Sequence, residues 1–93
     1  MFVGICKLEL HLMEGNSLKE KRQVIRSIIE RLKNRFNISI AEVGDLDVIR
    51  RSSIGFTVVS NEKTYIERLM GKVINFIDSD VRVQIIDIDK EIH

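Results

Sequence analysis

Residues 2–12 alternate between apolar and polar side chains, and this pattern constrains the fold more than any other feature of the sequence. One set of alternate positions is apolar or small, namely Gly4, Cys6, Leu8, Leu10 and Leu12, and the other set contains Ile5, Lys7, Glu9 and His11. Successive side chains of a strand point to opposite faces of a sheet, so this period of two predicts a half-buried strand. The sheet that holds it should have one covered face and one open face.

The residues after this strand predict a turn and then a capped helix. Glu14-Gly15-Asn16 interrupts the alternation, as turn residues do. Ser17 followed three positions later by Glu20 is a capping box, in which each side chain accepts a free backbone N–H of the first turn. Apolar residues then recur three and four positions apart, which predicts an amphipathic helix that ends at Asn37; they are Ile25, Ile28, Ile29, Leu32 and Phe36.

Two short runs rich in β-forming residues follow, at 38–43 and 54–59. In the second run Ile54, Phe56 and Val58 share one face. Gly44 lies between the runs, and we expect it to adopt a backbone angle that other residues resist. The polar connection at 45–52 carries no pattern that assigns it a structure.

A second helix and a last strand complete the chain. Ser60-Asn61 is a possible cap, and Asp78-Ser79-Asp80 closes the helix. Gly71 lies inside this helix and weakens it by about 1 kcal/mol relative to Ala. Residues 81–88 form the last strand, whose phase slips at Ile85-Ile86 and so indicates a bulge or a fully covered patch. The apolar stripe of the helix consists of Ile66, Leu69, Met70, Val73 and Ile77.

The resulting order is βαββαβ, two similar halves within 93 residues. This order predicts an α+β fold of the ferredoxin-like type, a single domain over residues 1–93. Its four-stranded antiparallel sheet would carry both helices on one face and leave the other face open. Lys7, Glu9 and His11 would lie on the open face.

The composition belongs to a globular protein, with 44% hydrophobic and 31% charged residues. The only cysteine, Cys6, excludes an intramolecular disulfide and a CxxC-type zinc site, and its place among leucines predicts a buried thiol. Charged residues interrupt the N-terminal apolar run, so we expect no signal peptide. No apolar run approaches the ~20 residues of a membrane span, so we expect no membrane partner and a cytoplasmic location.

The net charge of +1 conceals an uneven distribution. Residues 18–36 contain seven basic and two acidic side chains, a net charge of +5. Residues 78–93 contain five acidic and two basic side chains, a net charge of −3. The chain therefore combines a basic first helix with an acidic last strand, a separation that bears on its partners and not on its fold.

Four of the basic residues, Lys19, Arg22, Arg26 and Lys33, fall within an arc of roughly 60° on a helical wheel. Such a stripe can follow a phosphate backbone, and a solvated helix face is the alternative interpretation. The strand faces lack the aromatic residues on which an RRM-type sheet stacks bases, so any RNA contact would run through helix and loop. The candidate nucleic-acid-binding residues are Lys19, Lys21, Arg22, Arg26 and Lys33, joined by Arg50 and Arg51 if their loop folds to the same side.

No group of residues predicts catalysis, so we expect no enzyme and no cofactor or metal. His11 and His93 lie far apart in the pattern, and Asp45 and Asp47 have the character of turn residues. Asp87, Asp89 and Glu91 form an acidic row on the last strand, which is typical of a solubilising or edge-protecting strand.

The stretches LELHLMEGNSLKEKR (8–22), NRFNISIAEVG (34–44) and VVSN (58–61) resemble the YlxP-like bacterial family, which has no known function. The resemblance runs over essentially the whole chain and implies a ferredoxin-like domain. It also implies that the gene lies beside genes for translation-initiation and ribosome-maturation factors. No catalytic residues are implied by the resemblance. The loop after Gly44 departs from the family, because Asp45 and Ile49 stand where related chains often carry histidine and tryptophan. The family's recurrent positions fall on Ser17, Leu18, Lys19, Lys21, Arg22, Glu42, Gly44 and Asp47.

Two functional hypotheses follow. The first is an RNA- or ribosome-associated binding module that acts through the basic first helix. The alternative is a homodimeric or protein-interaction module without a nucleic-acid role, which would use the open sheet face or an exposed strand edge.

Overall fold

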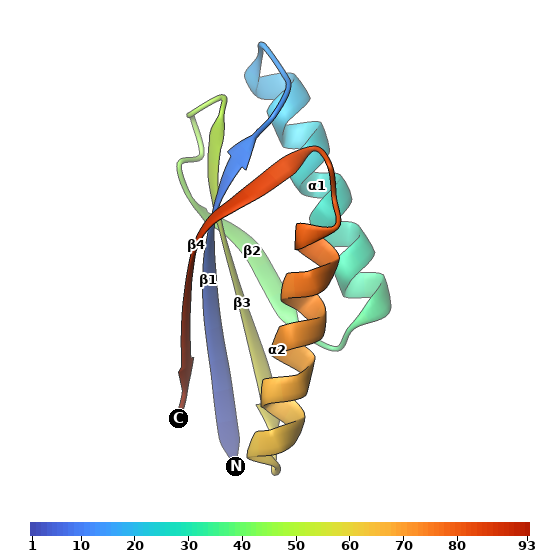
Figure 1. The fold of residues 1–93 in the computed structure, drawn as a ribbon, viewed down its shortest axis with the longest axis vertical. Coiled ribbons are helices and arrows are strands. Elements are labelled where there is room, and N and C mark those ends of the chain that lie inside the picture. Colours follow the sequence, from blue (N-terminus) through green and yellow to red (C-terminus); the bar gives the residue numbers. More distant parts are fainter.

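The computed structural model describes residues 1–93 and contains six elements in the predicted order (Figure 1). The strands form one antiparallel sheet with the order β2-β3-β1-β4, and both helices cover the same face of it. The ferredoxin-like fold predicted from the pattern is therefore confirmed. The elements are β1 (Phe2–Leu12), α1 (Leu18–Arg35), β2 (Ser39–Gly44), β3 (Arg51–Ser60), α2 (Lys63–Asp78) and β4 (Val83–Ile92).

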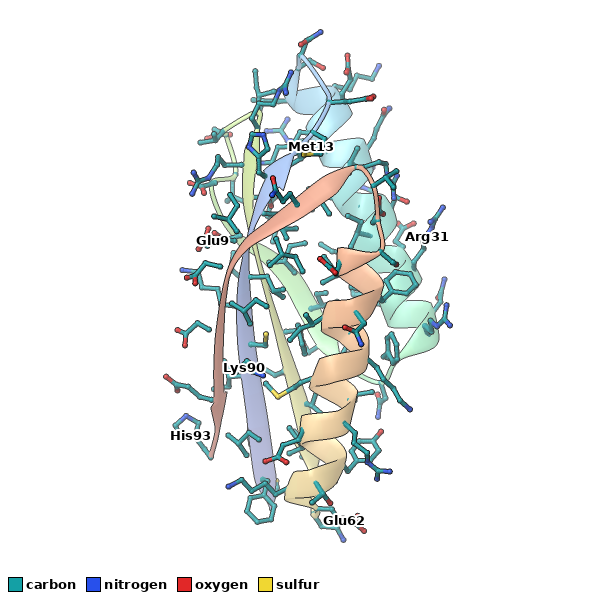
Figure 2. All side chains as sticks on the ribbon, viewed as in Figure 1. Glu9, Met13, Arg31, Glu62, Lys90 and His93 are labelled. Carbon is teal, nitrogen blue, oxygen red and sulfur yellow. The ribbon has the colours of Figure 1, made fainter.

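The core lies between the sheet and the two helices. The predicted inward positions of β1 and β3 and the whole stripe of α2 are buried. In α1, three of the predicted positions are buried, and Ile29 and Phe36 pack against the core from its edge. Burial of these side chains is the main stabilising contribution, at about 25 cal/mol per Å² of apolar surface. The outward positions Lys7, Glu9 and His11 lie on the open face, as predicted, and Figure 2 shows Glu9 on the side of the sheet away from the helices.

The caps of the two helices differ from the prediction in detail. The Ser17 hydroxyl accepts the Glu20 N–H at 3.2 Å, but the Glu20 carboxylate accepts the N–H of Asn16 instead of Ser17, at 3.3 Å. At α2 the expected cap was wrong: Glu62 is the N-cap and its side chain makes no cap bond. The Ser60 hydroxyl instead accepts the Glu62 N–H at 3.0 Å, which closes a turn before the helix.

The connection after β2 also corrects one expectation. Gly44 has an ordinary backbone angle, and its neighbour Asp45 adopts the left-handed conformation with φ 57°. Glycine suits position 44 for a different reason, because a Cβ there would lie 3.0 Å from the side chain of Ser53. Asp45 accepts the Val48 N–H, so residues 45–48 form a tight turn, and β3 begins at Arg51.

The phase slip predicted near Ile85 is a β-bulge. Glu9 pairs with Asp87 and the next residue, Leu10, pairs with Ile85, which leaves Ile86 as the extra residue. After the bulge the strand continues to Ile92, four residues beyond the predicted end. Asp87, Asp89 and Glu91 pair opposite Glu9, Lys7 and Ile5, and this places the acidic row on the open face of an edge strand.

Charge separates between the two layers. The helices carry ten basic and four acidic residues, whereas the strands carry three basic and five acidic residues. The helix layer is therefore the electropositive side of the molecule. Neither helix combines the length and the apolar composition that a membrane-crossing helix needs.

Candidate nucleic-acid interface

Three basic residues of α1 line a shallow hollow on the side of the helix that faces β2. Its volume is about 390 Å³, and its lining combines three cations with two apolar and two acidic side chains: Arg22, Arg26, Lys33, Ile25, Ile29, Glu30 and Glu42. We call it the basic hollow. Three of the four residues on the predicted stripe thus share one surface. Lys19 is exposed and lies one turn before Arg22, outside the lining.

These cations are largely free to bind an anion. Arg22 lies 3.5 Å from the carboxylate of Asp47, and both side chains are exposed. An exposed pair of this kind contributes at most about 1 kcal/mol, so a phosphate can compete with it. Arg26, Lys33 and Lys19 form no ion pair within the chain.

Lys21 was expected at this surface, and the structure shows that expectation to be wrong. Its side chain is fully buried, and its Nζ lies 2.9 Å from Oε2 of Glu42 on β2. The same ammonium donates to the backbone carbonyl of Asp45, and the Ser52 hydroxyl donates to Glu42 at 2.6 Å. Lys21 therefore joins the first turn of α1 to the sheet and to the turn at 45–48.

The position of Lys21 on the helical wheel indicates this burial. At 100° per residue, Lys21 falls about 20° from both Ile28 and Leu32, in the middle of the apolar stripe, and well outside the arc of the other cations. A charged side chain at such a position is buried only with a partner. Glu42, on the predicted strand, is that partner, and the pattern did not indicate which residue of the sheet would meet the helix.

Arg50 and Arg51 do not extend the basic hollow. Arg50 donates to the carbonyls of Gly15 and Met13, at 3.1 and 3.2 Å, and so fastens the loop to the turn before α1. Arg51 pairs with His11 in register and lies on the open face of the sheet, opposite to the helices. The condition under which the two arginines would join the stripe is therefore not met, because Arg50 is bonded to the turn before α1 and Arg51 begins β3 with its side chain on the open face.

Burial and hydrogen bonds within the fold shift the pKa of several other titratable groups. Burial raises the pKa of the Cys6 thiol to about 11, so the thiol is protonated at neutral pH and is a poor nucleophile. A hydrogen bond from the Ser53 hydroxyl, at 2.5 Å, lowers the pKa of Glu9, and Lys7 and Arg51 add to this effect. Arg82 donates to both oxygens of Asp80 and lowers its pKa. No group of three or more potential metal ligands occurs in the structure.

The open face of the sheet has an apolar hollow of about 340 Å³ over β2 and β3, where Gly55 lacks a side chain. Ile5 and Val43 border it and are 42% and 55% exposed. The β4 side of the same face is acidic, since Asp87 and Asp89 lie there. This face is therefore less electropositive than the helix layer.

Comparison with known proteins places the chain in a family. A family model described as "Protein of unknown function (DUF503)" matches residues 3–90. The chain belongs to this family. Uncharacterized protein YlxP of Bacillus subtilis (strain 168) is 39% identical over 77 residues, which are 83% of this chain and 84% of the relative. The resemblance to YlxP-like proteins is therefore confirmed.

A solved structure, described as a dimeric ferredoxin-like protein from an uncultured marine organism, is similar to the whole chain. It is 10% identical, with a TM-score of 0.43, and the match covers 100% of this chain and 94% of that one.

Residues that the YlxP-like resemblance singled out meet in the structure. Lys21 pairs with Glu42, and Arg22 lies beside Asp47, although the partners are 21 and 25 positions apart in the sequence. Part of the SLKEKR motif thus builds the junction between α1 and the loop after β2. Arg22 also borders the basic hollow, so the motif supplies both structural contacts and a candidate binding residue.

Proposed function

We propose that this member of the DUF503 family is an RNA-binding module whose first helix follows a phosphate backbone. The observation that supports this most directly is the basic hollow, where Arg22, Arg26 and Lys33 lie together and exposed on one side of α1. Each phosphate that such a residue neutralises releases counterions and so adds affinity. A ribosomal RNA or ribosomal subunit is the partner that the family resemblance suggests.

The separation of charge between the layers supports the same function. A polyanion is attracted to the helix layer and repelled by the acidic row on β4, so it approaches in one orientation. Contacts with phosphates give affinity without sequence specificity. The proposed module has no catalytic role.

The test is binding of ribosomal RNA and ribosomal subunits at two salt concentrations, with a charge reversal in the basic hollow. We expect Arg26→Glu to weaken RNA binding at least tenfold and to leave the fold unchanged, since Arg26 is exposed in the middle of α1. The matched control is Lys63→Glu, the same change of charge in the first turn of α2, where a carboxylate suits the helix dipole. Equal binding by the two variants, or no binding by the wild type at low salt, would refute the proposal.

A second candidate is homodimerisation through the open sheet face, which the exposed apolar hollow around Gly55 favours. Light scattering on the wild type and on Val43→Lys tests it, since a lysine there places a charge within the apolar border. A dimer that Val43→Lys dissociates supports this candidate, and a monomeric wild type excludes it at the concentration used.

A further inference from the structure

A second hollow lies between the C-terminal ends of the two helices, on the side of α1 that faces α2. Its volume is about 650 Å³, within the range of about 300–1,000 Å³ that is common for small-ligand sites. We call it the interhelical hollow. No acidic side chain contributes to its lining, which consists of Arg35, Phe36, Lys72, Asn75, Phe76 and Ser79.

Aromatic rings form one wall of the interhelical hollow. Phe36 and Phe76 are half-buried and meet edge to face, with their ring centroids 6.4 Å apart. The Cζ atom of Arg35 lies 5.3 Å from the centre of the Phe76 ring, a cation–π contact. This contact restrains the guanidinium against an aromatic surface. Aromatic rings and guanidinium planes are the two surfaces on which proteins stack unpaired bases.

The polar groups of the interhelical hollow are available to a ligand. Arg35 and Lys72 form no ion pair within the chain. The Asn75 carboxamide lines the hollow and can donate and accept hydrogen bonds at a base edge. The Ser79 hydroxyl donates to the carbonyl of Phe76 at 2.7 Å, so its oxygen remains free to accept.

The C-terminal ends of the two helices affect where in the interhelical hollow a negative charge can bind. Both α1 and α2 terminate at this hollow, and their last carbonyls carry partial negative charge. A phosphate is therefore disfavoured beside Asn75 and Ser79, whereas a neutral base is accepted there. Arg35 and Lys72 supply the positive charge for the phosphate.

We propose that the interhelical hollow binds one unpaired nucleotide of a single-stranded RNA. The base stacks on the Arg35–Phe76 surface with its edge toward Asn75, and the phosphate contacts Arg35 and Lys72. This inference rests on the proposed function and adds to it the class of RNA, because a base inside a duplex offers neither its face nor its pairing edge.

The test compares a single-stranded oligouridylate with a blunt RNA duplex of equal length, by fluorescence anisotropy at low salt. We expect Arg35→Gln to weaken single-strand binding about tenfold and Lys72→Gln to weaken it several-fold, with little change for the duplex. Lys63→Gln, which removes the same charge from the other end of α2, is the matched control and stays within about twofold of the wild type. Urea unfolding of each variant verifies that it is folded.

A conservative variant separates stacking from charge. Arg35→Lys keeps the positive charge and loses the planar group, so we expect about a fivefold loss of single-strand affinity. In NMR titrations with the oligouridylate, the Asn75 side-chain amide and the Phe36 and Phe76 ring signals should shift.

The outcomes distinguish this inference from the proposed function. If the duplex binds as tightly as the single strand, and the Arg35 and Lys72 variants behave as Lys63→Gln does, the interhelical hollow is not a nucleotide site and the phosphate-binding helix stands. If Arg35→Lys binds as the wild type does, the hollow contributes charge and not stacking, and the inference is wrong. Absence of binding to either RNA at low salt overturns both proposals.

Discussion

At the scale of single residues, Lys21 shows how a charged side chain can form part of a core. Its ammonium is enclosed between the Glu42 carboxylate and the Asp45 carbonyl, and Ser52 satisfies the carboxylate from the other side. No buried side-chain nitrogen or oxygen of the protein lacks a hydrogen-bond partner. Such a pair fixes how α1 sits on the sheet, and removal of one partner is costly because the other stays desolvated.

We therefore expect Lys21→Met to lower the free energy of unfolding by about 3 kcal/mol, since Glu42 keeps its charge with only the Ser52 hydroxyl as partner. Urea unfolding followed by circular dichroism measures this change. At temperatures where the variant is folded, its affinity for RNA should fall less than that of Arg26→Glu, because the lost ammonium is not at the surface and only the charge of Glu42 at the edge of the basic hollow is left uncompensated.

The double variant Lys21→Met/Glu42→Gln is the control for this explanation. It leaves no unpaired charge, and an amide can still bond to Ser52, so much of the lost stability should return. A loss of RNA affinity in Lys21→Met as large as that in Arg26→Glu would contradict the burial of Lys21.

At the scale of elements, α2 contains a glycine at a position where the fold does not require one. Gly71 has an ordinary helical backbone, and a Cβ added there meets no atom within 4 Å. Gly71→Ala should thus stabilise the protein by about 1 kcal/mol, because alanine loses less backbone entropy when the helix forms. A thermal melt should show a midpoint about 4–8 °C higher than that of the wild type.

Gly4→Ala is the matched change with the opposite expectation. Gly4 lies on β1 beneath α2, and its added Cβ would overlap the Ile66 methyl group. The strand or the helix must shift, which costs about 1–3 kcal/mol. A neutral Gly4→Ala would show that the space between β1 and α2 is larger than the structure indicates.

At the scale of the whole molecule, the two layers give the protein two sides of different charge. Cations of α1 line two hollows, the basic hollow toward β2 and the interhelical hollow toward α2. A single strand that occupied both would contact up to five cations, namely Arg22, Arg26, Lys33, Arg35 and Lys72.

The salt dependence of binding measures this number. The logarithm of the affinity for single-stranded RNA should fall with the logarithm of salt concentration, with a slope of about −0.7 for each neutralised phosphate, or roughly −3.5 for five. Arg26→Ala should make the slope less negative by about 0.7. Fluorescence anisotropy titrations at four or five salt concentrations give both slopes. A slope near zero, or one that Arg26→Ala leaves unchanged, would contradict a phosphate track on α1.

The fold could be predicted from the sequence alone, because its periodic patterns are local. Alternation in β1, the stripes of α1 and α2, and the phase slip near Ile85 each follow from which face of an element is buried, and that choice is written within a few neighbouring residues. The grouping of Arg22, Arg26 and Lys33 was predictable for the same reason, since they lie on one helix.

Which charged side chains are free and which are bonded within the protein depends on contacts that form only when the chain folds. Lys21 and Arg50 belong to basic stretches of the sequence, yet one is buried against Glu42 and the other is bonded to backbone carbonyls. The interhelical hollow likewise depends on Arg35 of α1 meeting Phe76 of α2. These contacts join residues that are 21 or more positions apart, and no local pattern encodes which distant partner a side chain meets when the helices pack on the sheet.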